Sequence, residues 1–363
     1  MTAVAMPTSA GFRARFPILD DVVHLASCSL GPRSAALDEA MARMLDVLRE
    51  DPTPWDFWLG QVLQARDAFA ALINAEPAQV AVVPSATIGA YQVASTRDWS
   101  TRPGIVAADV EYPSVAHIWA AQQARGATLR YVPETGPFDA DERTGLVSVP
   151  LVSYRTGATL PVGDVVARAR AAGALTFVDA YQAVGVLPVD VAALGCDFLV
   201  SGTMKYLLGL PGIAFLYARD GVADDLDPQL TGFFGRTNPL AFDPFAVDYP
   251  PDARRYQVTM PTLPAALAAN AGLGLIGGLD LAAVERHVTA LARRAAERIE
   301  GVAAPTGPYV NVPDADPMGL ARFLNARRIF PARGRSVRLS FHYFNSEADV
   351  DAAAAAIAEW RRR

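Results

Sequence analysis

One lysine stands alone among the basic residues of this chain. Lysine and arginine together number 32, and Lys205 is the only lysine among them. Either side chain suits a solvated surface. Arginine cannot replace lysine where the chemistry needs a primary amine, because only the amine loses its proton readily and condenses with a carbonyl group as a Schiff base. Lys205 is therefore a candidate catalytic residue.

An acidic residue occupies a second position suited to chemistry. Asp179 closes the apolar run LTFVD, and Lys205 follows the next apolar run, DFLVS at 197–201. Ligands of open α/β sheets bind at the carboxyl ends of the strands. A pyridoxal 5'-phosphate site needs a lysine that holds the aldehyde and a carboxylate that keeps the pyridine nitrogen protonated, so that the ring acts as an electron sink. The two residues together predict such a site.

The elements around these residues alternate. Apolar runs predict strands at 79–83, 104–108, 129–132, 146–152, 175–179, 197–201 and 213–218, with helices at 88–95, 115–126 and 162–172 between them. Such alternation indicates an α/β fold with a mostly parallel sheet covered on both faces. Helices are also expected at 34–49, 60–76 and over 263–300. The pattern strand, helix, strand, helix at 309–312, 318–326, 336–340 and 347–361 predicts a smaller α+β domain.

A glycine motif at 272–277, GLGLIG, matches the dinucleotide fingerprint GxGxxG. The fingerprint functions only after a strand and before a helix. The preceding stretch, PTLPAALAANA, favours a helix, so we interpret these glycines as points of close packing and not as a nucleotide site. The four histidines are scattered, and the two cysteines, Cys28 and Cys196, have no metal-binding spacing. No metal site is predicted.

Composition narrows the class of protein. The chain has 363 residues, a net charge of −6, 52% hydrophobic residues and 19% charged residues, which is typical of a globular protein and argues against nucleic-acid binding. No apolar run reaches about 18 residues, so no membrane span is expected. The N-terminus lacks the pattern of a signal peptide, and the two cysteines suit free thiols. These features predict a cytoplasmic protein.

The segment that holds both chemical residues resembles a family signature. Asp179, Gln182, Gly185, Asp197 and Lys205 match the pattern D-x-x-Q-x-x-G…D…K of class V aminotransferases, the group of cysteine desulfurases, kynureninase and isopenicillin N epimerase. The resemblance implies a fold-type I enzyme with a seven-stranded sheet, a pyridoxal 5'-phosphate cofactor, a small amino-acid substrate and a homodimer with active sites at the interface. It also implies a large domain over 15–280, with the segment 1–35 bordering the active site, and a small domain over 281–363.

The same resemblance assigns further residues. Beside Lys205, Asp179 and Gln182, the cofactor would contact Ala86 and Thr87 through its phosphate and Tyr112 through ring stacking. Ser201 and Thr203 are substitutes for the family's displaced phosphate-binding serine, and Thr259 would reach the cofactor from the partner chain. The implied substrate contacts are Arg338, which would grip the α-carboxylate, and Ser29, Tyr154, Arg155 and Phe233. Arg155 would either meet a second anionic group on the substrate or lie on the surface.

Departures from the family pattern bear on the reaction. Met204, in place of a histidine or tyrosine, cannot move a proton, and Met260 stands where the partner's threonine is expected. Both cysteines precede residue 200, which argues against a persulfide-forming cysteine desulfurase, and Gln182, Met204 and Phe233 disfavour kynureninase.

Four reactions stay open: β-elimination, transamination, decarboxylation and epimerisation. We favour β-elimination of the C–S lyase type on a cysteine-derived or similar β-substituted amino acid, with an aminotransferase as the alternative. Lys205 would carry the proton, and His117, Tyr154 and Tyr206 are candidate helpers. A non-catalytic protein of the same fold and an NAD-dependent oxidoreductase are rival interpretations, which the retained Asp179, Lys205 and Arg338 and the misplaced glycine motif disfavour.

Overall fold

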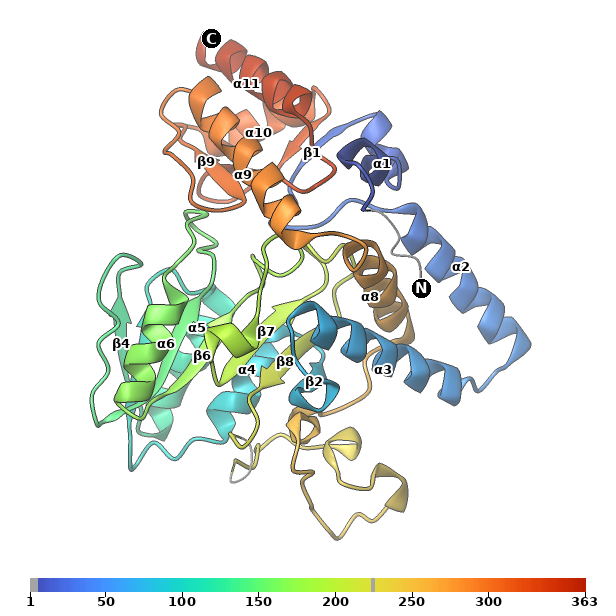
Figure 1. Cartoon of the computed structure of the whole chain (residues 1–363), viewed down its shortest axis with the longest axis vertical. Coiled ribbons are helices and arrows are strands. Elements are labelled where there is room, and N and C mark those ends of the chain that lie inside the picture. Colours follow the sequence, from blue (N-terminus) through green and yellow to red (C-terminus); the bar gives the residue numbers. More distant parts are fainter. Residues whose placement is uncertain (1–5, 223–225) are drawn as a thin grey trace.

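A seven-stranded sheet forms the centre of the molecule. The computed structural model describes residues 6–222 and 226–363, and its arrangement is drawn in Figure 1. The strand order is β2-β8-β7-β6-β5-β3-β4. The bounds are Val80–Val83 (β2), Gly104–Ala108 (β3), Thr128–Val132 (β4), Thr144–Pro150 (β5), Leu175–Asp179 (β6), Phe198–Gly202 (β7) and Ala214–Ala218 (β8). Only β8 runs antiparallel to the other strands of the sheet. The predicted α/β class and the mostly parallel sheet are confirmed.

Helices bury both faces of this sheet. Adjacent residues of one strand belong to opposite cores: Ile105 packs in the core that includes Trp119, whereas Val106 packs in the core that includes Phe69. The first face is covered by α4 (Ala86–Ser95) and α5 (Pro113–Ala121), and the second by α3 (Trp55–Leu72), α6 (Val162–Ala171) and α8 (Leu263–Ile276). The strands read as continuous apolar runs because both of their faces are buried.

The predicted helix at 60–76 differs from the observed one. Helix α3 begins at Trp55, directly after the turn that ends in Pro54, and it ends at Leu72, just before Asn74 adopts a left-handed conformation. The predicted stretch at 263–300 forms two helices, α8 and α9 (Leu281–Arg298), which meet at 85°. No single helix in the described ranges is long and apolar enough to cross a membrane, although α8 and α9 meet those criteria as a bent pair.

The two ends of the chain meet in the C-terminal unit. This unit contains α9, β9 (Tyr309–Val312), α10 (Pro317–Asn325), β10 (Ile329–Pro331), β11 (Val337–Ser340) and α11 (Glu347–Arg361). The unpredicted strand β1 (Val23–Leu25) pairs in parallel with β10, which was also unpredicted. In Figure 1, α1 (Ser9–Arg13) lies beside this unit, and α2 (Ala35–Glu50) leads away from it to α3. The predicted boundary near residue 280 thus falls between α8 and α9.

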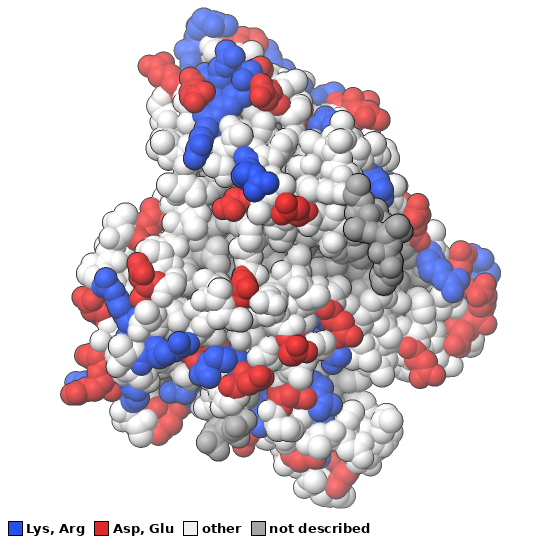
Figure 2. Space-filling view, in the orientation of Figure 1, with Lys and Arg blue, Asp and Glu red and all other residues white. Residues whose placement is uncertain are grey.

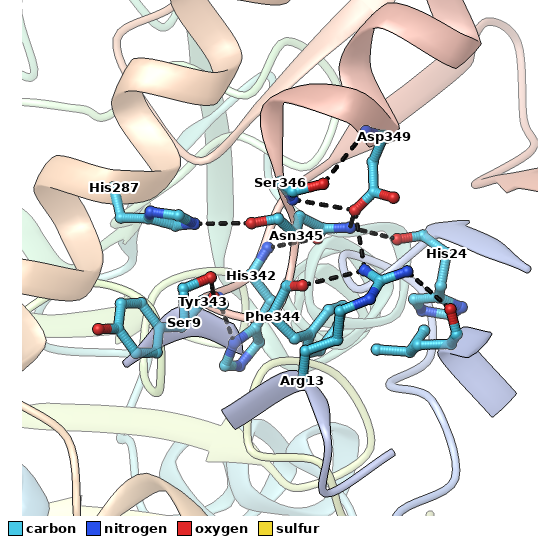
Figure 3. Close-up of polar contacts among 11 residues, drawn as sticks. Ser9, Arg13, His24, His287, His342, Tyr343, Phe344, Asn345, Ser346 and Asp349 are labelled. Carbon is cyan, nitrogen blue, oxygen red and sulfur yellow. Dashed lines mark hydrogen bonds and ion pairs between the residues drawn. The ribbon is translucent and has the colours of Figure 1, made fainter. Parts of the chain in front are cut away.

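A polar cluster fastens this junction, as drawn in Figure 3. Arg13 Nη1 on α1 donates to Asp349 Oδ2 on α11 at 3.0 Å and to the Phe344 carbonyl oxygen at 3.1 Å. The Asn345 side-chain amide donates to the His24 carbonyl oxygen at 2.9 Å. The backbone carbonyl oxygen of Asn345 lies 2.8 Å from His287 Nε2. The segment before α2 is therefore held by the last helices of the chain.

Charged side chains are interspersed over the face drawn in Figure 2, and a largely uncharged region crosses its middle. A long irregular segment, residues 226–262, extends at the end of the molecule away from the C-terminal unit (Figure 1). It exposes large apolar side chains, namely Leu240, Phe242, Phe245 and Val247. We refer to residues 226–262 as the extended loop.

Candidate active site

A cavity of about 230 Å³ opens at the carboxyl ends of the parallel strands. Its walls come from the segments that follow β2, β3, β5, β6 and β7. The lining residues are Pro84, Ser85, Ala86, Thr87, Val110, Tyr112, Ser114, Val115, Pro150, Val152, Tyr154, Asp179, Tyr181, Gln182, Met204, Lys205, Pro211, Gly212 and Ile213. The fold therefore brings together Lys205, Asp179, Gln182, Ala86, Thr87, Tyr112 and Tyr154, all of which were predicted as site residues.

The loop after β7 that carries Lys205 is held from three sides. The Gly31 N–H donates to the Met204 carbonyl oxygen at 2.8 Å, from the N-terminal segment. His342 Nε2 contacts the Tyr206 carbonyl oxygen at 3.0 Å, from the C-terminal unit. Within the loop, Leu208 adopts a left-handed conformation with φ 59°, which is uncommon for a branched residue and persists only where surrounding contacts enforce it.

Helix α8 supplies the third contact and explains the glycine motif. A Cβ on Gly272 would overlap the carbonyl oxygen of Leu207, in the lysine loop, whereas nothing lies within 4 Å of a Cβ on Gly274. The motif lies on a helix, as predicted, and its interpretation as close packing is confirmed for Gly272 but is wrong for Gly274. Gly185 of the signature has a related function: its φ is +99°, and a Cβ there would overlap the Tyr206 carbonyl oxygen.

The amine of Lys205 is buried between two aromatic rings. Its Nζ lies 4.4 Å from the ring centroid of Tyr181 and 5.2 Å from that of Tyr112, and the residue is 6% exposed. Burial lowers the pKa of Lys205 to about 8, against the opposing attraction of Asp179. A buried amine with a lowered pKa holds a larger neutral fraction near pH 7, which is the nucleophilic form.

Tyr181 was missed by the sequence reasoning. It lies within the signature, between Asp179 and Gln182, where the pattern leaves the residue type free. The tight turn after β6, in which the Tyr181 N–H donates to Asp179 Oδ1 at 2.9 Å, brings its ring under the lysine. An aromatic residue two positions after a strand-end carboxylate was the only available signal.

Two buried carboxyl groups lie on the sheet side of the cavity. Burial raises the pKa of Asp179, and burial together with the charge of Asp179 raises the pKa of Glu111 to about 8. Glu111 accepts a hydrogen bond from Ser148 Oγ at 2.6 Å and one from the Tyr112 N–H at 3.2 Å. Glu111 was not predicted as a site residue, and its contact with the Tyr112 backbone makes it a candidate positioning residue for that ring.

The cavity fits pyridoxal 5'-phosphate. Oδ2 of Asp179 meets no hydrogen-bond donor from the described part of the chain, so the carboxyl group can receive the N–H of a protonated pyridine ring. At the start of α4, Ser85 Oγ caps the Ile88 N–H at 3.2 Å, while Ala86 and Thr87 line the cavity. A helix N-terminus favours a phosphate group there. Gln182 Oε1 is buried without a partner, as an acceptor available to the ligand.

Other predicted site residues lie elsewhere. Arg155 and Arg338 line a neighbouring cavity, which Tyr154 shares with the first. Ser29 is exposed on a third cavity, beside the C-terminal unit. The hydroxyl of Ser201 is buried within β7 and has no partner among the described residues.

One further contact and two helpers need correction. Thr203 does not line the cavity, because its hydroxyl donates to the Leu210 carbonyl oxygen at 2.6 Å and closes the lysine loop. Phe233 and Thr259 belong to the extended loop and do not line the cavity of their own chain, so their contacts, of which that of Thr259 was expected across a dimer, stay predictions. The two helpers are also absent from it, since His117 points outward on α5 and Tyr206 is buried behind the loop. Among the predicted helpers, only Tyr154 lines the cavity.

The two cysteines are both buried, Cys28 at 1% and Cys196 at 0% exposed. Burial raises the pKa of the Cys196 thiol to about 12, which keeps it protonated and unreactive at neutral pH. Neither side chain lines the cavity. Over residues 6–222 and 226–363, no three His, Cys, Asp or Glu side chains are grouped to hold a metal ion.

Comparisons with known proteins agree with this geometry. Residues 58–353 match the family model described as aminotransferase class-V. The uncharacterized aminotransferase YcbU of Bacillus subtilis is 33% identical over 356 residues, which cover 93% of this chain and 94% of the relative. A kynureninase of Pseudomonas fluorescens is 29% identical over 318 residues, which cover 82% and 75%.

A solved structure shares the fold. The cystine C–S lyase C-DES, in complex with its product cysteine persulfide, has a TM-score of 0.86 at 22% identity, with 95% of this chain and 99% of that chain covered. At that identity the likeness shows the fold alone. The match to the family model over most of the length, together with the lysine, the strand-end carboxylate and the helix N-terminus around one cavity, shows that this chain belongs to the class V aminotransferase family of pyridoxal phosphate-dependent enzymes.

Proposed function

We propose that the enzyme catalyses β-elimination on an α-amino acid with a leaving group on its β-carbon, in particular a cysteine-derived thioether. The observation that carries the proposal is the set of titratable side chains on the cavity. In the described structure these are Asp179, Lys205 and the tyrosines Tyr112, Tyr154 and Tyr181. Histidine and cysteine are absent from this lining, so Lys205 is the one amine base at the reacting centre.

The residues have distinct roles in this reaction. The bound cofactor supplies an electron sink that acidifies the α-carbon. Lys205 would hold the cofactor through Nζ, and the same amine would remove the α-proton of the substrate. Its lowered pKa, about 8, suits a base that works near neutral pH. Asp179 would keep the ring nitrogen of the cofactor protonated, and the Tyr112 and Tyr181 rings flank the Lys205 amine.

A single base on one face suits elimination better than epimerisation. Epimerisation needs a second proton carrier on the opposite face. Burial raises the pKa of Tyr181 far above its ordinary value, which disfavours that hydroxyl as an acid at neutral pH. Transamination is the second candidate, because Lys205 could equally return the proton to the cofactor, and a relative of similar length bears the name aminotransferase.

Product analysis tests the proposal. Purified enzyme is incubated with an S-alkylcysteine, and thiol, pyruvate and ammonia are measured, with and without an added 2-oxo acid. Elimination releases equal amounts of thiol and pyruvate without an acceptor, whereas transamination needs the acceptor and leaves the thioether intact. Lys205→Ala is expected to abolish product formation and the yellow absorbance of the Schiff base between the lysine and the cofactor. Lys205→Arg is expected to do the same, because it keeps the positive charge but cannot form a Schiff base. A wild-type enzyme that releases no thiol from any thioether amino acid contradicts the proposal.

We also propose a homodimer in which the extended loop reaches the partner's site. Phe233 and Thr259 do not line the cavity of their own chain, and Phe245 is 96% exposed nearby in sequence. Large apolar side chains exposed together on one segment are typical of an interface. Light scattering of the wild type and of a Phe245→Asp variant is the test: a monomeric wild type contradicts the dimer. Separately, we propose a cytoplasmic location, because the two cysteines are free thiols.

A further inference from the structure

A second cavity, of about 280 Å³, opens beside the active-site cavity. It is lined by Pro113, Tyr154, Arg155, Gly334, Arg335, Ser336 and Arg338. Tyr154 lines both cavities, and its ring contacts Tyr112 edge-on, with the ring centroids 5.3 Å apart. A substrate whose α-carbon lies at Lys205 can therefore extend past Tyr154 into the second cavity.

Three guanidinium groups gather on this cavity without a carboxylate. Arg155, Arg335 and Arg338 have no ion pair with any acidic side chain of the described structure. Arg338 Nη1 donates to the Tyr154 carbonyl oxygen at 2.9 Å, and Arg155 Nη2 donates to the Asp109 carbonyl oxygen at 2.8 Å. Arg338 also meets the hydroxyl of Tyr309, which is uncharged. Each of these two guanidiniums keeps further N–H groups free for a ligand.

The surrounding backbone is tied in place. On β9, Asn311 donates through Nδ2 to the carbonyl oxygens of Arg155 and Thr156, at 2.8 and 2.9 Å. Its Oδ1 accepts from Ser336 Oγ at 2.9 Å, on the opposite wall. Asn311 also faces Arg338 across the β9–β11 ladder. One side chain thus fixes both walls, so the like charges are held together by the fold.

Charge balance points to the ligand. Three like charges around one cavity repel, and the repulsion is offset when anionic groups bind between them. The α-carboxylate of an amino acid, paired with Arg338, neutralises one of the three. Arg155 and Arg335 then remain for a second anion.

We infer that the natural substrate is an amino acid with a second anionic group, a carboxylate or sulfonate, on its side chain, bound by Arg155 and Arg335. This inference rests on the proposed function for the reaction that follows. The α-proton passes to Lys205 Nζ, the Cβ–S bond breaks, and sulfur leaves with the electron pair and is protonated to a thiol that carries the anionic group. The remaining 2-aminoacrylate takes up one water and yields pyruvate and ammonia, with no net oxidation or reduction.

Two matched substrates test the inference. S-carboxymethylcysteine and S-carbamoylmethylcysteine have the same shape and differ by the charge of the terminal group. We expect kcat/KM to favour the acid about tenfold or more, as one charge-assisted interaction would provide. Arg155→Gln and Arg335→Gln should each remove most of that preference while changing the amide substrate little. Arg333→Gln, on the same loop but outside this cavity, should keep the preference.

A binding measurement separates this inference from the proposed reaction. Calorimetry on the holoenzyme compares succinate with butyrate, and we expect tighter binding of succinate that weakens about tenfold in Arg155→Gln. If neither cysteine derivative is cleaved but succinate binds in this way, the anion site holds and the elimination proposal fails. Equal turnover of acid and amide, or equal binding of succinate and butyrate, overturns the second anion site.

Discussion

Replacing Gly272 with alanine tests how closely α8 supports the lysine loop. The added Cβ would overlap the Leu207 carbonyl oxygen and lie 2.9 Å from both the Gly209 nitrogen and the Leu208 carbonyl carbon. These are backbone atoms, so no side-chain rotation relieves the clash and either the helix or the loop must move. Overpacking of this kind costs about 1–3 kcal/mol of stability, partly offset by the roughly 1 kcal/mol that alanine gains over glycine within a helix.

Gly274 provides a matched control on the same helix. A Cβ there meets nothing within 4 Å, so Gly274→Ala should leave stability unchanged or raise it by up to about 1 kcal/mol. The two variants should therefore differ by about 1–3 kcal/mol in the free energy of unfolding, measured by urea titration of the same preparation. Gly272→Ala should also slow the return of the yellow Schiff-base absorbance when cofactor is added to the apoenzyme, because the displaced loop carries Lys205. Equal stability of the two variants would refute the packing argument.

Three further predictions concern buried polar groups. Burial lowers the pKa of His342 from 6.5 to about 4, so the unfolded chain takes up a proton at a higher pH than the folded protein does. The free energy of unfolding is therefore highest above pH 6.5 and falls as the pH drops below it; from about pH 7.5 to about pH 5 the loss is about 2 kcal/mol. Urea titrations should show a flatter pH profile for His342→Gln, and an imidazole that titrates near 6.5 by NMR would contradict this. Burial raises the pKa of Glu111 from 4.5 to about 8, so the free energy of unfolding falls as the pH rises through that interval. Glu111→Gln should retain the contact with the Tyr112 N–H and remove this loss of stability. Glu111→Ala should weaken cofactor binding, measured by absorbance titration. Asp349→Ala removes the ion-pair partner of Arg13 and should lower the free energy of unfolding by about 2–3 kcal/mol, with faster hydrogen exchange over residues 9–25; unchanged exchange there would contradict the role of this ion pair in holding the segment.

The lysine and the aspartate could be found from the sequence because their chemistry is local. A sole lysine and a carboxylate at the end of an apolar run are visible in the residue types, and alternating apolar runs predicted the β-strands of the central sheet to within about two residues. The GLGLIG motif was also correctly set aside, because a helix-forming stretch before a glycine is itself a sequence property.

Contacts between distant segments were beyond this reasoning. The strands β1 and β10 are each three residues long and pair across about three hundred positions, so no local pattern announces them. Glu111 resembles any acidic residue until the fold buries it beside Asp179, and Tyr181 resembles any aromatic residue until the turn sets its ring at the lysine. Thr203 was misassigned because a hydroxyl's nearest acceptor, here the Leu210 carbonyl oxygen, depends on how a loop closes.

The sequence by itself thus determined the cofactor chemistry, since an amine and a carboxylate have few substitutes in that role. The tertiary structure decided which groups surround them. It excluded His117 and Tyr206 from the cavity and gathered Arg155, Arg335 and Arg338 on a neighbouring one. The reason is physical: the chemistry of a side chain is fixed by its type, whereas its burial, charge balance and neighbours arise only when segments far apart in the chain pack together.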